Sequence, residues 1–250
     1  MVQQNNERLV VSLDEVSSTN AELKRLQHQS PLPEGSMVMT NFQTSGRGQV
    51  GNTWHSERNK NLLFSLLLYP HCVKAKNQFI ISRIVSLAIT KVLQQQTDNI
   101  TIKWPNDIYW NNMKIAGILI ENSLAGQQID YSIIGAGINV NEDEFPTNLP
   151  NPISLKQITK KEYFRDDLLT AFYQEFFYLY NRLQNGEVLN LESEYMQHLY
   201  RKEGIHWFFD KQGSFQASIK TVLPAGHIVL TTHPDKEERI YSFKEVSFEI

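Results

Sequence analysis

The sequence predicts an α+β protein, with a mixed, largely antiparallel sheet packed with helices and a small all-β module at the C-terminal end. Residues 77–96 and 162–185 carry apolar side chains at helical spacing. Short apolar runs bounded by turn residues lie between them and are typical of strands. From residue 205 onward the chain reads as short strand-like runs. We therefore expect two domains, residues 1–203 and 204–250.

The N-terminal part is expected to alternate short strands with one helix. Residues 9–13 are apolar and predict a strand. Thr19 and Glu22 have the spacing of a capping box, so we expect a helix to begin here and to end before Pro31. A second strand is expected at residues 36–42.

The central part is expected to contain a buried strand, a long helix and a group of further strands. Residues 61–69 form a continuous apolar run that ends at Pro70, which favours a buried strand over a helix. The helix at 77–96 follows. Asn111 and Asn112 separate two apolar runs and suit a tight hairpin. The strands of this group are expected at 100–103, 108–110, 113–115, 115–122 and 129–140.

The chain beyond residue 140 is expected to begin with a loop at 141–161, which is rich in Pro and Asn. A second long helix at 162–185 should follow, with Gly186 as its C-terminal cap. A shorter helix is expected at 188–200, and the short strands of the β module come after it.

The composition is that of a globular protein of 250 residues, with 41% hydrophobic and 20% charged residues. The net charge of −3 offers no general basic surface, so we expect no DNA binding. The single cysteine, Cys72, rules out an internal disulfide or a multi-thiolate metal site. No apolar leader segment and no run of ~18 apolar residues is present, which predicts a cytoplasmic protein without membrane contact.

The most informative segment is QTSGRGQVGNTW at residues 43–54. Its glycines let the backbone approach a ligand closely, and successive N–H groups can converge on an anion. Arg47 adds a fork suited to phosphate or carboxylate. We interpret the segment as a loop that wraps a small anionic ligand, with a mobile surface loop as the alternative. The spacing of Gly46, Gly48 and Gly51 also fits a dinucleotide-binding pattern, but a strand-like run follows where that pattern requires a helix.

Two further segments place reactive side chains at strand ends. KWPND, residues 103–107, combines a cation, an aromatic ring, an amide and a carboxylate. Asp107 could bind Mg²⁺ or orient a lysine, although ordinary solvated charges are the alternative. Lys114 can aim its ammonium into a site from the mouth of an apolar strand, or extend to solvent. Gly117 in that strand indicates close approach of a ligand or of backbone, and Asn139 offers the donors and acceptors that an adenine edge requires.

Five segments, taken in order, resemble the biotin protein ligase family. They are SSTN at 17–20, FQTSGRGQVGNTW at 42–54, KWPNDI at 103–108, KIAGILIE at 114–121 and IIGAGINVN at 133–141. The resemblance implies a catalytic domain of the class II synthetase and biotin–lipoyl ligase type, and the terminal module is similar to the family's SH3-like domain. P-loop, metalloprotease, CxxC and GxSxG motifs are absent from the sequence.

The resemblance implies a two-step reaction. Biotin and MgATP give biotinyl-5′-AMP, and a lysine of a biotin carboxyl carrier domain then attacks the mixed anhydride. Both steps need positioning and charge stabilisation rather than an enzyme nucleophile. ATP, Mg²⁺ and biotin would then be substrates, the carrier domain would be the protein partner, and no tightly bound cofactor is expected.

The resemblance also implies roles for individual residues. Lys114 would bind the biotin carboxylate and then stabilise charge on the α-phosphate, Arg47 would neutralise phosphates, and Asp107 would position the acceptor lysine or a metal ion. The expected biotin-binding residues are Ser18, Thr19, Asn20, Gln43, Arg47, Gly48, Gln49, Lys114 and Gly117. The expected ATP-binding residues are Arg47, Trp54, Lys103, Asn106 and Asn139. The glycine loop is expected to order over the bound ligand.

The chain departs from the family pattern in its loop and at its N-terminal end. Many members carry a second arginine where Gln49 stands and further basic residues at Val50 and Asn52, so this loop has less positive charge. Only 16 residues precede the SSTN segment, and we therefore expect no N-terminal DNA-binding domain.

Two alternative functions stay open. A lipoate or octanoate ligase or transferase would have the related fold and act on a different acyl group. A biotin sensor or adenylate-binding regulator without transfer activity would be compatible with Gln49. Exposed strand edges would also permit a homodimer.

Overall fold

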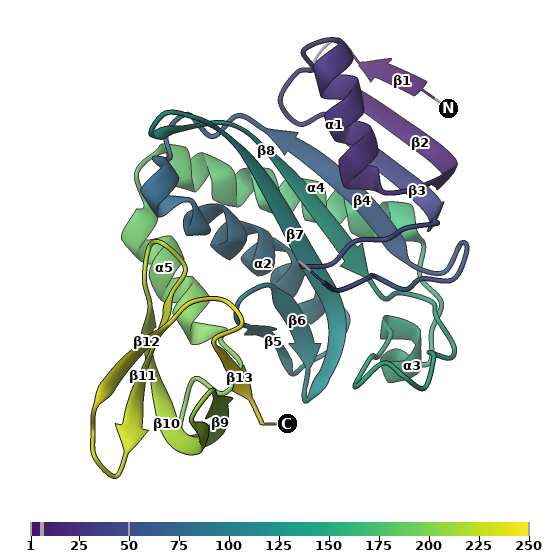
Figure 1. Ribbon diagram of the computed structural model, residues 1–250. Helices are drawn as coiled ribbons and strands as arrows, with labels where there is room; N and C mark the ends of the chain where they lie inside the picture. Colours follow the sequence, from purple (N-terminus) through teal and green to yellow (C-terminus); the bar gives the residue numbers. More distant parts are fainter. Residues whose placement is uncertain (1, 6–7, 50, 250) are drawn as a thin grey trace.

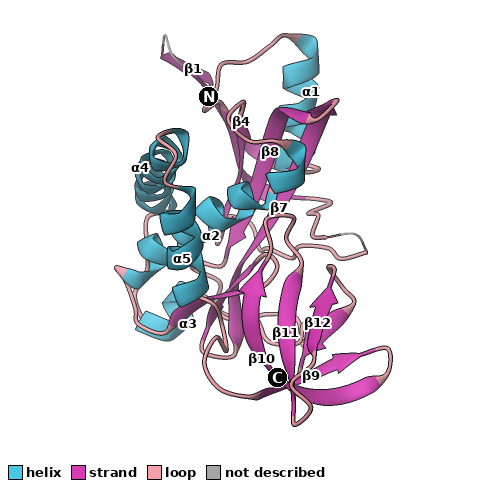
Figure 2. Cartoon of the chain, turned by 90° about the vertical axis from the view of Figure 1, so that its left-hand side faces the viewer, coloured by secondary structure: helices cyan, strands magenta, loops and turns pink. Residues whose placement is uncertain are grey.

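The computed structural model describes residues 2–5, 8–49 and 51–249. It consists of a large eight-stranded sheet with helices and a smaller five-stranded sheet near the C-terminus (Figure 1). Long helices cover one face of the large sheet, and a helix from the N-terminal part covers a portion of the other face (Figure 2). The predicted α+β architecture is therefore confirmed.

The large sheet has the strand order β1-β2-β3-β4-β8-β7-β6-β5. Its strands are β1 (Val2–Asn5), β2 (Arg8–Val16), β3 (Met37–Gln43), β4 (Leu62–Leu68), β5 (Ile100–Lys103), β6 (Asp107–Trp110), β7 (Met113–Ala125) and β8 (Gln128–Ile138). Neighbouring strands are antiparallel except β2 and β3, which are parallel because a helix connects them. The predicted hairpin at Asn111 and Asn112 joins β6 to β7, and Asn111 adopts a φ of 50°.

The helices are α1 (Thr19–Gln29), the 3₁₀ helix η1 (Ala75–Asn77), α2 (Phe79–Gln94), α3 (Leu155–Thr159), α4 (Arg165–Gln184) and α5 (Val188–Gln197). The apolar faces of α2, α4 and α5 pack together on one side of the sheet and form the main core. Helix α1 covers the opposite side. Across the described ranges, none of the helices combines the length and the apolar content needed to cross a bilayer.

Strand β8 has two different faces because side chains alternate along a strand. Ile134 belongs to the main core below α2, whereas Ile133 points the other way and packs with Leu23 of α1. Gly135 and Gly137 follow on the same face as Ile133. The α1 side of the sheet therefore lacks side chains just beyond the helix, and this gap becomes the candidate site.

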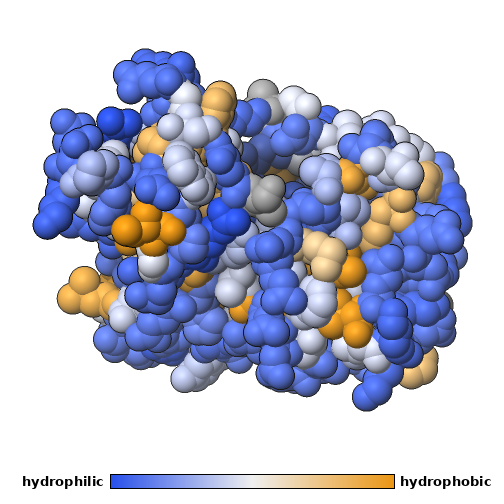
Figure 3. Space-filling view, turned by 90° about the horizontal axis from the view of Figure 1, so that it is seen from below, coloured by the Kyte–Doolittle hydropathy of each residue, from blue (hydrophilic) through white to orange (hydrophobic). Residues whose placement is uncertain are grey.

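The smaller sheet has the order β12-β11-β10-β9-β13 and is antiparallel throughout. Its strands are β9 (His206–Asp210), β10 (Gly213–Val222), β11 (Ile228–His233), β12 (Glu238–Tyr241) and β13 (Val246–Phe248). It begins two residues after Gly204, near the expected boundary, although the division into domains 1–203 and 204–250 stays a prediction. The face seen in Figure 3 is mainly hydrophilic, with apolar side chains in small separate groups.

Hydrogen bonds from two buried side chains connect the small sheet to the rest of the molecule, one from a helix and one from the turn between β5 and β6. Arg83 of α2 is 1% exposed, and its guanidinium pairs with Glu192 of α5 and donates to the carbonyl oxygen of Val222. Trp104 Nε1 donates to the carbonyl oxygen of Gly226 at 2.8 Å. The turn between β10 and β11 is therefore held from two directions.

The capping box predicted at Thr19 and Glu22 is wrong. Helix α1 begins at Thr19 with Ser18 as its N-cap, and the Ser18 side chain makes no capping bond in the described part of the chain. The Thr19 hydroxyl instead lies 3.2 Å from Gln43 Oε1. A hydrogen bond to Gln43, which is distant in the sequence, therefore takes the place of the local capping interaction expected between Thr19 and Glu22.

The predicted loop at 141–161 is wrong in part, because it contains α3. Ser154 and Gln157 form a capping box there, a signal that the sequence carried. Helix α4 starts three residues later than predicted and ends at the C-cap Asn185, with Gly186 just beyond it at a φ of 84°. Strand β1 was not predicted.

Replacement of Arg83 by alanine should lower the free energy of unfolding by about 3 kcal/mol. This is the low end of the cost of breaking a buried ion pair, because Glu192 is partly exposed. Chemical denaturation would measure the change. Arg25→Ala, which removes an exposed pair with Glu22, is the control and should leave the midpoint unchanged. A loss no larger than the control's would contradict the role of Arg83 at this junction.

Candidate active site

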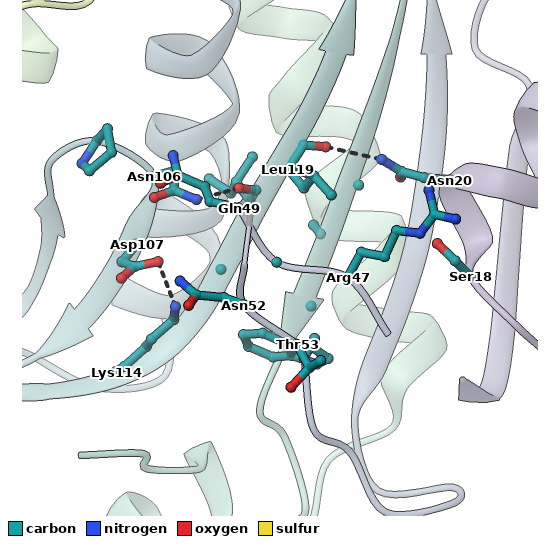
Figure 4. A pocket seen from close by; sticks show the side chains of 18 of the residues that line it. Ser18, Asn20, Arg47, Gln49, Asn52, Thr53, Asn106, Asp107, Lys114 and Leu119 are labelled. Carbon is teal, nitrogen blue, oxygen red and sulfur yellow. Dashed lines mark hydrogen bonds and ion pairs between the residues drawn. The ribbon is translucent and has the colours of Figure 1, made fainter. Parts of the chain in front are cut away.

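The gap beside α1 is a cavity of about 170 Å³ between the sheet and the glycine loop. The SSTN segment, the glycine loop, the KWPND turn and strands β7 and β8 all contribute to its wall (Figure 4). The predicted site residues that line it are Ser18, Thr19, Asn20, Gln43, Arg47, Gly48, Gln49, Trp54, Lys103, Asn106, Asp107, Lys114 and Gly117. Asn139 lines a second cavity, which adjoins the first.

A hydrogen-bond network arranges the polar groups at the α1 end of the first cavity. Gln43 Oε1 accepts from the Thr19 main-chain N–H at 2.8 Å and lies 3.2 Å from the Thr19 hydroxyl. Ser65 Oγ lies 2.8 Å from Thr19 Oγ1 and 2.6 Å from Asn20 Oδ1. Asn20 Nδ2 donates to Glu121 Oε2 at 2.7 Å. Since Gln43 Oε1 is occupied as an acceptor, the amide keeps its Nε2 donor for the cavity.

Ser65 and Glu121 were not among the predicted site residues. Ser65 is completely buried and interrupts the apolar run of β4. Glu121 follows the apolar run of β7. A polar residue in a buried run needs a partner, and this is the signal by which sequence reasoning could have found Ser65.

Three glycines of β7 and β8 form the floor of the cavity. A Cβ atom on Gly137 would lie 2.4 Å from Trp54 Cε2, and one on Gly117 would lie 2.8 Å from Trp54 Cζ3. A Cβ atom on Gly135 would lie 2.3 Å from Asn20 Oδ1. The Trp54 indole and the Asn20 amide can therefore rest on the sheet because these three positions carry no side chain. Gly135 and Gly137 were not predicted, although their two-residue spacing marks one face of a strand.

The glycine loop crosses above this floor as a short hairpin. Arg47 and Thr53 form an antiparallel bridge across it. Figure 4 shows the Arg47 side chain extending toward Ser18 and Asn20. Trp54 Nε1 is buried and has no hydrogen-bond partner among the described residues. The described part of the loop is thus packed against the cavity, and ordering of the loop by a ligand stays a prediction.

The Lys114 ammonium lies in the cavity. Its Nζ is 2.7 Å from Asp107 Oδ1 and 5.6 Å from the centroid of the Trp54 ring. The Asp107 side chain is only 18% exposed. Asn106 anchors the turn, because its Nδ2 donates to the carbonyl oxygen of Ile118 at 2.6 Å. The KWPND turn therefore places a carboxylate beside an ammonium, and the alternative of solvated charges does not hold for Asp107.

Lys103 supplies a second ammonium at the same end of the cavity. Its Nζ lies 4.9 Å from the Tyr109 ring centroid and 5.5 Å from that of Phe248. Burial lowers the pKa of the Lys103 ammonium, and the charge of Asp107 opposes this shift. Phe248 belongs to β13, so the small sheet forms part of the surroundings of a predicted site residue.

The second cavity has a volume of about 360 Å³ and shares Trp54 and Lys114 with the first. Phe145, Leu149, Pro150 and Pro152 supply apolar surface. Asn139 is 3% exposed, and its Nδ2 donates to the carbonyl oxygen of Ile153 at 3.1 Å. Asn139 Oδ1 is buried and lacks a hydrogen-bond partner within the described ranges. The cavity therefore suits a flat, mostly apolar ligand. Asn139 Oδ1 is an unused hydrogen-bond acceptor for such a ligand.

Comparison with known sequences identifies a family that this chain matches. A sequence model of the biotin/lipoate A/B protein ligase family matches residues 13–139, which is 127 of the 250 residues. The bifunctional ligase/repressor BirA of Bacillus subtilis (strain 168) is 35% identical over 142 residues, or 54% of this chain and 42% of the relative. The biotin–protein ligase of Homo sapiens is 34% identical over 138 residues, or 52% of this chain and 19% of the relative. Both matches span less than half of the relative's length.

Solved structures have the same fold over nearly the whole chain. The biotin protein ligase from Aquifex aeolicus in complex with biotin and ATP matches with a TM-score of 0.80 at 24% identity, covering 96% of this chain and 98% of that one. The enzyme from Leishmania major in complex with biotinyl-5-AMP gives a TM-score of 0.65 at 22% identity, with coverages of 93% and 98%. The family match over residues 13–139 decides the assignment, and the chain belongs to the biotin/lipoate A/B protein ligase family.

Proposed function

We propose that this protein activates biotin with MgATP as biotinyl-5′-AMP and transfers the biotinyl group to a lysine of a biotin carboxyl carrier domain. The observation that carries the proposal is the pair of adjoining cavities that share Lys114 and Trp54. Two ligands bound side by side would meet at the Lys114 ammonium. Relatives named biotin–protein ligase support biotin as the acid that is activated.

The first cavity suits the cyclic urea of biotin. A urea has one carbonyl acceptor and two N–H donors, and it needs the opposite set of groups from the protein. Gln43 Nε2 and the Ser18 hydroxyl can donate, and Thr19 Oγ1 can accept. Because Gln43 is already bonded to Thr19, and both Thr19 and Asn20 are bonded to Ser65, these groups are held in place before the ligand arrives.

The second cavity suits the adenine base. Its apolar surface can pack against a flat ring, and the unused Asn139 Oδ1 can accept a hydrogen bond from the exocyclic amine. The phosphates would then lie toward Lys114, with Lys103 and Arg47 on the wall of the neighbouring cavity. Two ammonium groups near one carboxylate, with the Arg47 guanidinium farther along the same cavity, suit a triphosphate.

The reaction would proceed in two displacements without an enzyme nucleophile. In the first, a biotin carboxylate oxygen attacks the α-phosphorus, and pyrophosphate leaves. In the second, the neutral amine of the carrier lysine attacks the carbonyl carbon, AMP leaves, and the amine loses a proton as the amide forms. Lys114 would stabilise the negative charge that develops in both steps. Asp107, 2.7 Å from Lys114, would hold that ammonium and position the incoming amine.

Magnesium would enter with the nucleotide. The described residues contain no group of three or more His, Cys, Asp or Glu side chains that could hold a metal ion. Phosphate oxygens and water would then supply most of the ligands, as Mg²⁺ commonly requires. Asp107 is the carboxylate on the cavity wall that could complete the set.

A cytoplasmic location and a homodimer complete the proposal. Cys72 is an exposed free thiol, which suits a reducing compartment. The β5 edge of the large sheet is occupied, because Ile102 exchanges main-chain hydrogen bonds with His198 and Tyr200. Pairing between copies through this sheet would therefore use the opposite edge, at β1.

Incubation with ATP, Mg²⁺, biotin and a biotin carboxyl carrier domain should increase the mass of the carrier by one biotinyl group. Intact-mass spectrometry would measure the product, and a carrier with its target lysine replaced by arginine is the control. Activity with lipoate or octanoate in place of biotin would establish the alternative acyl specificity. Binding of biotin and ATP without any transfer would identify a sensor.

Replacement of Lys114 by alanine should reduce the rate of biotinyl-AMP formation on the order of 10²-fold or more, because one preorganised charge stabiliser is lost. Pyrophosphate release at saturating biotin and ATP would report the rate. Lys24→Ala, on the exposed side of α1, is the matched control and should be fully active. Turnover of Lys114→Ala close to that of the control would exclude the assigned role.

A further inference from the structure

An ion pair between a buried carboxylate and a partly exposed histidine lies at the second cavity and has no place in the mechanism above. His55 lines this cavity, and its Nε2 lies 3.4 Å from Glu142 Oε1. The Glu142 side chain is 0% exposed, whereas that of His55 is 41% exposed. The imidazole therefore lies between a buried carboxylate and the open cavity.

The surroundings of Glu142 hold its carboxylate in one orientation. Asn61, also completely buried, donates from Nδ2 to Glu142 Oε2. The Asn61 amide cannot turn over, because its Oδ1 accepts from the main-chain N–H of Val140 at 3.0 Å. Ser154 Oγ donates to the main-chain carbonyl oxygen of Glu142 at 2.6 Å, which fixes the backbone from which the carboxylate extends. The second carboxylate oxygen, Oε1, is left facing His55.

A carboxylate is costly at such a position, since a buried charge must be paired. Burial raises the pKa of the Glu142 carboxyl above its ordinary value, and the hydrogen bonds from Asn61 and from the Glu57 main chain, together with the proximity of His55, oppose that shift only in part. A neutral glutamine could accept the Asn61 hydrogen bond equally well. The charge of Glu142 therefore has a use in holding the His55 ring, with Nε2 turned toward the protein.

With Nε2 committed to Glu142, Nδ1 is the ring nitrogen left for a ligand. No hydrogen bond joins Nδ1 to another residue within the part of the chain that the structure describes. The fully buried Glu142 carboxylate needs a cationic partner, and an imidazole in that role carries an N–H on each ring nitrogen, Nδ1 included. The cavity then presents one donor, His55 Nδ1, and one acceptor, Asn139 Oδ1.

We propose that His55, held by Glu142, is a specificity-determining residue for the nucleotide. It donates from Nδ1 to a ring nitrogen of adenine that neighbours the exocyclic amine, while Asn139 Oδ1 accepts from that amine. Both polar edges of adenine carry this donor and acceptor side by side, through N6 with N1 or N6 with N7. Guanine has a carbonyl oxygen in place of the amine, so it would leave Asn139 Oδ1 facing another acceptor. The inference rests on the proposed function only in taking ATP as the nucleotide.

The test measures binding, so that it does not depend on turnover. Calorimetric titrations without biotin would give Kd values for Mg²⁺ complexes of ATP, GTP, 1-deaza-ATP and 7-deaza-ATP. The wild-type protein and His55→Phe would be compared, because phenylalanine keeps a flat ring and removes the donor. His55 is partly exposed, so this variant should fold.

We expect His55→Phe to bind ATP about 10- to 100-fold more weakly, as for loss of a hydrogen bond from a charged donor. One of the two deaza nucleotides should bind the wild-type protein with a similar loss of affinity relative to ATP. The His55→Phe substitution should not weaken the binding of that nucleotide further. The preference for ATP over GTP should fall. The assignment would be overturned if each deaza nucleotide bound more weakly than ATP by the same factor in the wild-type protein and in His55→Phe. Unchanged ATP binding by His55→Phe would overturn it as well.

Two further variants separate positioning from contact. Glu142→Gln keeps an acceptor for Asn61 and removes the charge, so it should show a smaller loss of ATP affinity, with its folding checked by thermal denaturation. His71→Phe, at an exposed position outside both cavities, should match the wild-type protein. If ATP binds as expected but no biotinyl-AMP forms when biotin is added, the proposed reaction fails while the assignment of His55 stands.

Discussion

The close packing of the Trp54 indole on the bare backbone of Gly117 and Gly137 is the contact on which the candidate site depends. Any side chain at Gly137 would have to occupy the place of the ring, since even a Cβ atom would lie 2.4 Å from it. The ring in turn forms a wall of both cavities and fixes the end of the glycine loop. The opposite face of the same strands carries the isoleucines of the main core. One pair of strands therefore supports both the fold and the site.

The charged groups of the site form a second level of organisation. Lys114 and Asp107 are neighbours because the hairpin between β6 and β7 folds their strands together. Lys103 lies between an aromatic ring of the large sheet and one of the small sheet. In this partly buried setting, charges interact more strongly than they would in water. Chemistry that proceeds by positioning and charge stabilisation is suited to such an arrangement.

Three buried polar atoms without hydrogen-bond partners among the described residues belong to side chains that line the two cavities: Trp54 Nε1, Asp107 Oδ1 and Asn139 Oδ1. A fourth, Glu142 Oε1, lies behind His55, and the two carboxylate oxygens belong to ion pairs. Unsatisfied polar atoms destabilise a folded protein and are uncommon in native structures. Other atoms of this kind, such as Ser86 Oγ and Tyr195 OH, lie away from both cavities. Those at the cavity walls are the ones that a bound ligand could reach and satisfy.

The sequence by itself determined the elements with strong periodicity and the segments rich in special residues. The helices at α2 and α4 and the hairpin at Asn111 were readable because helical spacing and turn chemistry are local properties. Glycine content marked the loop at residues 43–54, and the resemblance to the family pointed to the other segments. Tertiary structure alone decided that Thr19 bonds to Gln43 rather than capping its own helix, and which groups Ser65, Gly135 and Gly137 contact. It also paired His55 with Glu142 across 87 residues of chain. Contacts of this kind depend on which strands become neighbours, and strand order is set by burial of the whole sheet rather than by any one segment.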